Sequence, residues 1–524
     1  MLRFKSIFKP MKSILLYLSL SIILVLSCQP KRTLEFPPTD LETSMIIPQP
    51  LNINGTGSGF ALDMFTSIRV EEDDEAFQSV ADYLSQKIES RIGHNLNATS
   101  KGYTDIIIRK ASSFESDEAY ELMINENSLV LMAGTAAGAF RGIQTIRQLI
   151  PEEPNNSLAD NPIWVIPTGT IKDQPQYGIR STMLDVARHF FSVEDVKKYI
   201  DILAYYKINT FHMHLSDDQG WRIEIKSWPR LTEVGSTTGV GGGPGGYYTQ
   251  EDYQEIIEYA ADRHIIVIPE IDMPGHTNSA SLAYPFLNGN GQEIEVVTSM
   301  AVGYSTLDTR KDSVYAFVDD VIREISGITP GPYFHIGGDE SHVTEKDDYI
   351  YFIERVEKIV QKYGKQMIGW DEVATANLNS SSVAQWWNNE DNAKLAIDQD
   401  VQLILSPAKK AYLDMKYDND SEFGLRWAGY IPVDTAYQWN PEEYFPIENV
   451  LGVEAPLWGE TIRTIEELEY LAFPRVIGYA ELGWSIQENR NWEDYKKRLA
   501  HHGAFLRRNN VNYYKSPVIQ WGRN

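Results

Sequence analysis

The chain has 524 residues, of which 43% are hydrophobic and 11% aromatic, and this composition excludes wholesale disorder. It carries 47 Lys and Arg against 73 Asp and Glu, a formal net charge of −26, which argues against nucleic acid or an anionic membrane surface as a partner. At this length two domains are expected, one of them large enough to be a barrel.

The N-terminus has the pattern of an export signal. Three lysines precede an apolar run from Ile14 to Leu26, which is too short for a comfortable membrane span. Cys28, the only cysteine, follows this run directly, and the segment resembles the bacterial lipoprotein lipobox, in which the Cys is lipidated. We therefore expect a signal peptide over 1–28, lipid on Cys28 and a tether over 29–44. The chain would then be an exported bacterial lipoprotein, periplasmic or anchored at the outer membrane or cell surface, that meets the membrane only through its lipid.

Residues 45–172 are predicted to form a small α+β domain. Apolar residues at helical spacing indicate a helix over Asp74–Ile92, and a second helix is expected over Thr135–Leu149. The segment 151–175, rich in Pro and Asn, has the composition of a boundary. The strands expected in this domain are Phe60–Val70, Thr104–Arg109 and the hairpin of Tyr120–Ile124 with Ser128–Ala133.

Residues 173–524 show strand–helix alternation, which fits an α/β fold with a (β/α)8 barrel. The predicted strands are Gly178–Asp185, Thr210–Leu215, Ile265–Ile271, Tyr333–Ile336, Gln366–Trp370, Ser382–Trp386, Val401–Ser406 and Val450–Leu457. The predicted helices between them include Val193–Tyr206, Gln250–His264, Val314–Ser326, Asp347–Tyr363 and Asp391–Asp398. A last helix, about Trp492–Arg508, is expected to close the barrel.

The fourth predicted strand ends in two glycines and then two adjacent acids, Asp339 and Glu340. Neighbours on a strand point to opposite faces, so both acids can serve one site only where the strand turns into its loop. The carboxyl ends of barrel strands are where such a fold keeps its catalytic groups. The other predicted strands also end in acids, His or large aromatics, a pattern that packing alone does not explain.

Five motifs in chain order resemble those of the family 20 glycoside hydrolases, the β-N-acetylhexosaminidases. They are Met183–Phe191, Asn209–Arg222, Pro269–His276, His335–Glu340 and Leu457–Glu460. The resemblance covers roughly residues 45–510 and implies a catalytic (β/α)8 barrel preceded by a small α+β domain. Met213 stands where relatives often have Trp, a difference expected to affect packing rather than chemistry.

The activity implied by the resemblance is exo-acting, retaining removal of terminal non-reducing β-linked GlcNAc, or GalNAc, from glycans or chitooligosaccharides. The partner would be an oligosaccharide containing N-acetylhexosamine, and no cofactor or metal is expected. Such enzymes use the substrate's own 2-acetamido oxygen as nucleophile, through an oxazoline intermediate. Glu340 would be the general acid and base, Asp339 would hold the acetamide N–H, and Tyr412 would donate to the acetamide oxygen. Adjacent acids push their pKa values apart, so one can stay ionised while the other stays protonated.

The resemblance also assigns residues that hold the sugar and support the acids. Arg188, Glu460 and Asp414 would bind ring hydroxyls, and Trp370, Trp387 and Trp458 would wall the acetamide pocket, with Trp386 as an alternative to Trp387. Asp217 and His276 would form a pair behind Glu340, and Asp272 would support Asp339. His214 is equally compatible with a purely structural role.

Three alternatives remain open from the sequence. The same fold could release a disaccharide or act on a biofilm polysaccharide, and loops 235–248 and 287–306 would decide this. A glycan-binding lipoprotein on a dead barrel would lack an acid/base residue, but Glu340, Asp339 and Tyr412 are all present. A metal enzyme is disfavoured, because His212 and His214 stand two apart on a strand and the usual helical zinc spacing is absent.

Overall fold

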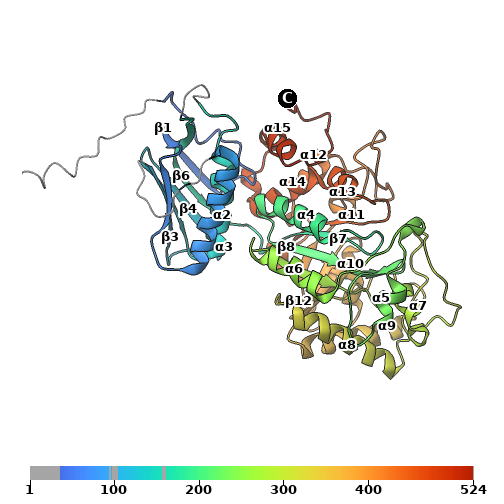
Figure 1. Cartoon of the computed structure of the whole chain (residues 1–524). Coiled ribbons are helices and arrows are strands. Elements are labelled where there is room, and N and C mark those ends of the chain that lie inside the picture. The colour runs from blue at the N-terminus through green and yellow to red at the C-terminus, as the bar shows by residue number, and fades with distance from the viewer. Residues whose placement is uncertain (1–35, 94–95, 97–103, 156–160, 523–524) are drawn as a thin grey trace, which may run out of the picture.

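The computed structural model describes residues 36–93, 96, 104–155 and 161–522, and two β-structures organise them (Figure 1). One is a six-stranded sheet in the N-terminal part of the chain, and the other is a closed barrel of eight strands. The predicted signal peptide and Cys28 lie outside the described residues. Of the predicted tether, residues 36–44 are described, and this part packs on the sheet, since Leu41 is fully buried and the N–H of Thr39 donates to the carbonyl of Gly57 at 3.2 Å.

The sheet has the strand order β1-β6-β4-β5-β3-β2, and the α2 and α3 helices lie along one of its faces (Figure 1). Its elements are β1 (Asn52–Leu62), β2 (Thr66–Val70), α2 (Glu75–Ile92), β3 (Thr104–Lys110), β4 (Tyr120–Ile124), β5 (Ser128–Ala133), α3 (Ala136–Leu149) and β6 (Trp164–Asp173). β2, β3 and β5 pair in parallel, and the other neighbours pair antiparallel. The predicted helices and the hairpin of β4 with β5 are confirmed.

Two predictions for this region were wrong. The strand expected over Phe60–Val70 is split by a turn after Leu62, where the N–H of Phe65 donates to the side chain of Asp63 at 2.8 Å. The expected boundary segment 151–175 contains β6, which pairs with both β1 and β4 and therefore belongs to the sheet. The Pro and Asn residues before this strand led to the prediction of a boundary in place of a strand.

The barrel closes in chain order, so the predicted α/β fold with a (β/α)8 barrel is confirmed. Its strands are β7 (Ile179–Asp185), β8 (Thr210–His214), β11 (Ile266–Glu270), β12 (Tyr333–His335), β13 (Gln366–Trp370), β14 (Val383–Trp386), β15 (Gln402–Leu405) and β16 (Val450–Leu457). All pairs are parallel, and each strand falls on a predicted one. A short ribbon of β9 (Ser216–Asp217) and β10 (Gly220–Trp221) follows β8.

Helices follow the barrel strands, and two of them begin with a capping box. Ser192 and Thr249 form capping boxes with Asp195 and Asp252 at the starts of α4 and α6. The helices are α4 (Val193–Tyr205), α5 (Arg230–Gly235), α6 (Gln250–Ala261), α7 (Asn278–Ala283), α8 (Asp312–Ile328), α9 (Lys346–Lys362), α10 (Glu390–Ile397), α11 (Ala408–Ala411), α12 (Val433–Tyr437), α13 (Ile465–Ala472), α14 (Arg475–Trp484) and α15 (Trp492–Arg508). Short 3₁₀ turns cover Val240–Gly242, Pro285–Leu287, Asp371–Thr375, Pro441–Glu443, Ile447–Asn449 and Gln487–Asn489.

The helix that closes the barrel is α14 rather than the predicted α15. α14 packs on β16 and β7, the two strands that complete the ring. α15 exists as predicted but lies further out, where Arg498 donates to Glu481 of α14 at 2.6 and 2.8 Å. None of the helices within the described residues is both long and apolar enough to cross a bilayer.

A buried ion cluster joins the sheet domain to the barrel. Glu118, just before β4, accepts from Arg141 of α3 and from Arg180 of β7, each at 2.7 Å. Burial alone would raise the pKa of Glu118, but Arg180 and Arg141 lower it to about 2. The cluster lies at the amino ends of the barrel strands, so the sheet domain supports the face opposite to the predicted site.

Candidate active site

A left-handed turn after β12 brings the two adjacent acids to one cavity. Gly337 and Gly338 have φ angles of 68° and 98°, and Glu340 has 47°. A Cβ on Gly337 would lie 1.8 Å from Oδ1 of Asp272, so only glycine fits there. The turn ends the alternation of the strand, and Asp339 and Glu340 therefore line the same cavity.

One histidine contacts both acids. Nε2 of His276 lies 3.5 Å from Oδ2 of Asp339 and 3.6 Å from Oε2 of Glu340. Its Nδ1 lies 3.2 Å from Oδ1 of Asp217, whose Oδ2 is 2.7 Å from the guanidinium of Arg188. Burial alone would lower the pKa of His276, but Asp217 and Asp339 raise it well above its ordinary value. The predicted pair of Asp217 and His276 thus lies next to both acids and not only next to Glu340.

Asp272 lies against Asp339 and against the turn. Its Oδ1 accepts the N–H of Gly338 at 3.1 Å. Burial, and then the charge of Asp339, raise the pKa of Asp272 well above its ordinary value. Burial also raises the pKa of Asp339 to about 6, with His276 opposing the shift and Glu340 adding to it.

The pKa of Glu340 moves the other way. Burial would raise it, but the contact with His276 and the positive charge of that ring lower it below its ordinary value. Two neighbouring acids with separated pKa values were expected, yet the expected general acid is the stronger of the two. The physical reason is exposure, since the side chain of Glu340 is 28% exposed and that of Asp339 is 9% exposed.

The acids open onto a cavity of about 330 Å³ at the carboxyl ends of the strands. The cavity is lined by Arg188, Met300, Val302, Asp339, Glu340, Trp387, Tyr412, Asp414, Leu425, Trp427, Trp458 and Glu460. Several of these side chains have buried polar atoms with no hydrogen-bond partner in the part of the chain that is described. They are Nε of Arg188, Oδ1 of Asp339, both carboxylate oxygens of Asp414, Nε1 of Trp458 and Oε2 of Glu460.

Asp185, at the end of β7, fixes the predicted sugar-binding arginine. Its Oδ1 accepts the backbone N–H of Arg188 at 3.0 Å, and its Oδ2 accepts from the guanidinium at 3.1 Å and from Gly459 at 2.8 Å. In the same cavity, burial and then the charge of Glu460 raise the pKa of Asp414 well above its ordinary value. A protonated Asp414 can donate as well as accept a hydrogen bond.

The two adjacent tryptophans, Trp386 at the end of β14 and Trp387 just after it, point to different places. Trp387 lines the cavity, with its ring stacked at 16° and 6.2 Å from that of Tyr412. Trp386 is buried elsewhere, with its ring 5.1 Å from those of Tyr444 and Phe445. Of the two candidates the structure therefore brings Trp387 to the site.

Trp458 forms part of the cavity wall, whereas Trp370 is not among the residues that line it. Trp370 is buried below, with its ring 5.5 Å from that of Trp458 and its indole N–H on Oε1 of Glu270 at 2.9 Å. In this position Trp370 supports the tryptophan wall from behind.

Several residues near the cavity were missed by the sequence analysis. Trp427 is 58% exposed at the rim, 5.7 Å from the ring of Tyr412, and Met300 and Val302 line the cavity from the segment 287–306. An isolated Trp in a loop carries no periodic signal that would have found it. Glu372 accepts the indole N–H of Trp387 at 3.1 Å, and burial followed by Asp371 raises its pKa to about 8.

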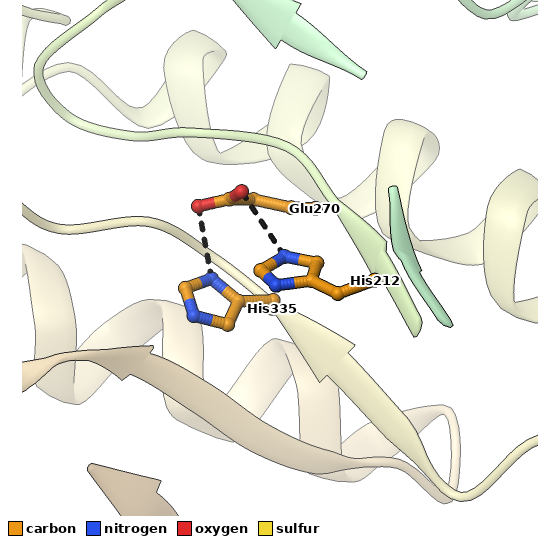
Figure 2. A group of neighbouring side chains, drawn as sticks. All are labelled: His212, Glu270 and His335. Atoms are coloured by element: carbon orange, nitrogen blue, oxygen red, sulfur yellow. Dashed lines mark ion pairs between the residues drawn. The ribbon is translucent and has the colours of Figure 1, made fainter. Parts of the chain in front are cut away.

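Below the cavity, the barrel interior holds a network of histidines around Glu270. Figure 2 shows Glu270 paired with His212 and His335, each at 3.1 Å. His214 Nδ1 lies 2.5 Å from the same carboxylate, and its Nε2 lies 2.9 Å from Asp217. His214 thus links the interior to the carboxylate behind His276. All these side chains are buried, and both carboxylate oxygens of Glu270 already have partners. The group therefore has the residue types of a metal site but no position open to a water or substrate ligand.

A closed parallel barrel with paired acids at its strand ends, in a cavity walled by aromatic rings, defines a glycosidase of the (β/α)8 class. Residues 177–487 match the model of glycosyl hydrolase family 20, catalytic domain, and residues 43–174 match that of glycosyl hydrolase family 20, domain 2. The chain belongs to this family and is a glycoside hydrolase, a β-N-acetylhexosaminidase.

Relatives and solved structures agree with this assignment. The chain is 40% identical to the β-N-acetylhexosaminidase of Cellulomonas fimi over 77% of this chain and 82% of that protein. It superposes on the family 20 β-N-acetylhexosaminidase of Streptomyces coelicolor A3(2) with a TM-score of 0.88 and 45% identity, covering 93% of this chain and 100% of that one. An exo-β-N-acetylglucosaminidase of Vibrio harveyi, solved with N-acetylglucosamine, gives a TM-score of 0.81 at 30% identity, covering 93% of this chain and 81% of that one.

The turn geometry predicts that Gly337→Ala lowers both activity and stability. The new methyl would collide with Asp272 and would also force a non-glycine residue to a φ of 68°, a strain of about 1–3 kcal/mol before any clash. Gly364→Ala is the matched control, because its φ is 73° and nothing described lies within 4 Å of the added Cβ. Thermal unfolding should show destabilisation of both variants, larger at 337 because of the added collision, and hydrolysis assays should show loss of activity only at 337. Full activity in Gly337→Ala would contradict this account of the turn.

Proposed function

We propose that this enzyme is exo-acting and retaining, and that it removes terminal non-reducing β-linked GlcNAc or GalNAc from glycans or chitooligosaccharides through an oxazoline intermediate. The observation that carries the proposal is the set of buried polar atoms in the cavity of Asp339 and Glu340 that have no hydrogen-bond partner among the described residues. Buried polar atoms are costly unless paired, and a ligand rich in hydroxyl groups would pair them. The exo mode and the sugar agree with the description of the Vibrio harveyi neighbour.

We propose that Asp339 and Tyr412 hold the acetamide group. Oδ1 of Asp339 is buried and has no hydrogen-bond partner among the described residues, so it can accept the acetamide N–H. Burial, and then the charge of Asp339, raise the pKa of Tyr412 well above its ordinary value, so its hydroxyl stays protonated and can donate to the acetamide oxygen. Holding that oxygen close to C1 makes its attack intramolecular, which is the step that substrate assistance requires.

Glu340 is the acid that faces the departing group. It is the more exposed member of the pair, so it can reach the glycosidic oxygen at the mouth of the cavity. We propose that it protonates that oxygen and then takes a proton from the attacking water. The reaction needs a protonated Glu340 beside an ionised Asp339. Because the pKa of Glu340 is lowered and that of Asp339 is raised, this active form is the minor one of the two singly protonated forms of the pair.

The shape of the cavity favours a chain end. Arg188, Asp414 and Glu460 close its polar side, with Asp414 fully buried. A sugar held against these side chains would have its next residue on the exposed side of the cavity, where Trp427, Met300 and Val302 are 58%, 51% and 40% exposed. Disaccharide release or cleavage within a polysaccharide would need space past the closed side.

The experiment that tests the proposal is hydrolysis of an aryl N-acetyl-β-glucosaminide beside the matching aryl β-glucoside. Turnover of the first and not the second is expected, since only the first carries the internal nucleophile. Glu340→Gln should lose roughly 10²-fold or more as a general acid, and Asp339→Asn a similar factor as a positioning group. Glu345→Gln, an exposed acid of the same loop, should leave the rate unchanged.

Product analysis separates the remaining alternatives. NMR of the first-formed sugar should show the β anomer, and a chitooligosaccharide should shorten by one residue at a time from its non-reducing end. Equal turnover of the glucoside would refute substrate assistance. Binding of GlcNAc without hydrolysis of either substrate would favour the glycan-binding reading.

The proton arrangement predicts an acidic pH optimum for kcat/KM. The pair must hold one proton in total, and the last proton leaves as pH rises through the pKa of Asp339, about 6. Activity should therefore fall above about pH 6, by roughly tenfold per unit, and fall again below the lowered pKa of Glu340, where both acids are protonated. A pH profile that is flat from about 5 to 8 would contradict this.

We also propose that the chain is an exported lipoprotein, on the strength of residues 1–28 alone, which lie outside the described part. Cys28→Ser should abolish incorporation of labelled palmitate in the bacterial host and should move the protein out of the detergent phase. Label that persists in the variant would refute lipidation at this residue.

A further inference from the structure

We propose that His276, Asp339 and Glu340 form a binding site for a divalent first-row transition ion such as Zn²⁺, which inhibits the enzyme. The ion would be an inhibitor and not a cofactor, because it would occupy the side-chain atoms that the reaction uses. The inhibition by the ion rests on the proposed function, whereas the binding of the ion does not.

The donor atoms already have the spacing that such an ion needs. Nε2 of His276 lies 3.5 Å from Oδ2 of Asp339 and 3.6 Å from Oε2 of Glu340, and the three donor atoms lie within 4.8 Å of one another. Two ligands of a tetrahedral ion at its usual bond lengths are about 3.4 Å apart. Small side-chain movements therefore suffice to close a three-ligand site.

His276 is held as metal-binding histidines usually are. Its ring is 3% exposed, and its Nε2 has no hydrogen-bond partner among the described residues and points at the two acids. The other ring nitrogen faces Oδ1 of Asp217 at 3.2 Å. A carboxylate behind a ligating imidazole fixes its orientation and strengthens it as a ligand. Asp217 is in turn held by His214 at 2.9 Å and by Arg188 at 2.7 Å.

The third ligand leaves the ion accessible. The side chain of Glu340 is 28% exposed at a cavity of about 330 Å³, so an ion can enter and a water can complete its coordination. This separates the site from the group of His212, Glu270 and His335, which is fully buried. One imidazole with two carboxylates suits zinc, cobalt or nickel better than magnesium or calcium, which prefer oxygen ligands alone.

The binding test uses the full chain at one fixed pH, with Zn²⁺ in calorimetry and Co²⁺ in visible absorption. One ion per chain is expected, with an imidazole–carboxylate spectrum for Co²⁺. Glu340→Gln and His276→Gln each remove a ligand, and Asp217→Asn should cost about 10–100-fold in affinity as the group behind the histidine. His342→Gln is the matched control, because this exposed histidine stands two residues from Glu340 but outside the site.

The activity test adds Zn²⁺ to the hydrolysis assay. Competitive inhibition that EDTA fully reverses is expected, with Mg²⁺ at the same concentration having no effect. Binding with the predicted variant pattern by a protein without hydrolase activity would refute the proposed function and leave the metal site standing. An active enzyme that Zn²⁺ neither binds nor inhibits, or binding that only His342→Gln abolishes, would refute the metal site alone.

Discussion

The site depends on burying more carboxylates than cations at the carboxyl end of the barrel. Asp217 stays ionised because it lies between Arg188 and His276, and its pKa is held well below its ordinary value by both. Asp339 shares His276 with Asp217, and burial raises the pKa values of both Asp272 and Asp339. When neighbouring buried acids cannot all ionise, one of them can carry a proton near neutral pH. Acid–base catalysis on a glycosidic bond requires such a protonated group.

The barrel floor holds this arrangement in place. Glu270 contacts His212, His335 and the indole N–H of Trp370, and it reaches Asp217 through His214 (Figure 2). Residues from successive strands are therefore connected below the cavity by paired polar groups rather than by apolar packing alone. Such a network has few alternative arrangements, because any buried member left unpaired costs free energy. We infer that this network, through His214 and Asp217, keeps His276 in position next to the two acids.

The same geometry explains why proton transfer and metal binding compete for one set of atoms. An imidazole that faces two carboxylates at 3.5 and 3.6 Å is near the ligand spacing of a coordinated tetrahedral ion. Binding of an ion at Nε2 requires that this nitrogen carry no proton.

The sequence by itself determined the strand order, the position of the barrel and the identity of the paired acids, because a buried parallel strand is a continuous apolar run and its catalytic residues follow it directly. It could not find β6 behind a Pro-rich and Asn-rich stretch, or the split of Phe60–Val70, since the turn at Asp63 rests on a local hydrogen bond and not on Gly or Pro. Only the tertiary structure decided that Trp387 and not Trp386 lines the cavity, that Trp370 lies behind the wall, and that Glu340 is the stronger acid. Those outcomes depend on depth, exposure and the position of His276, which belong to residues distant in the chain and are absent from any local pattern.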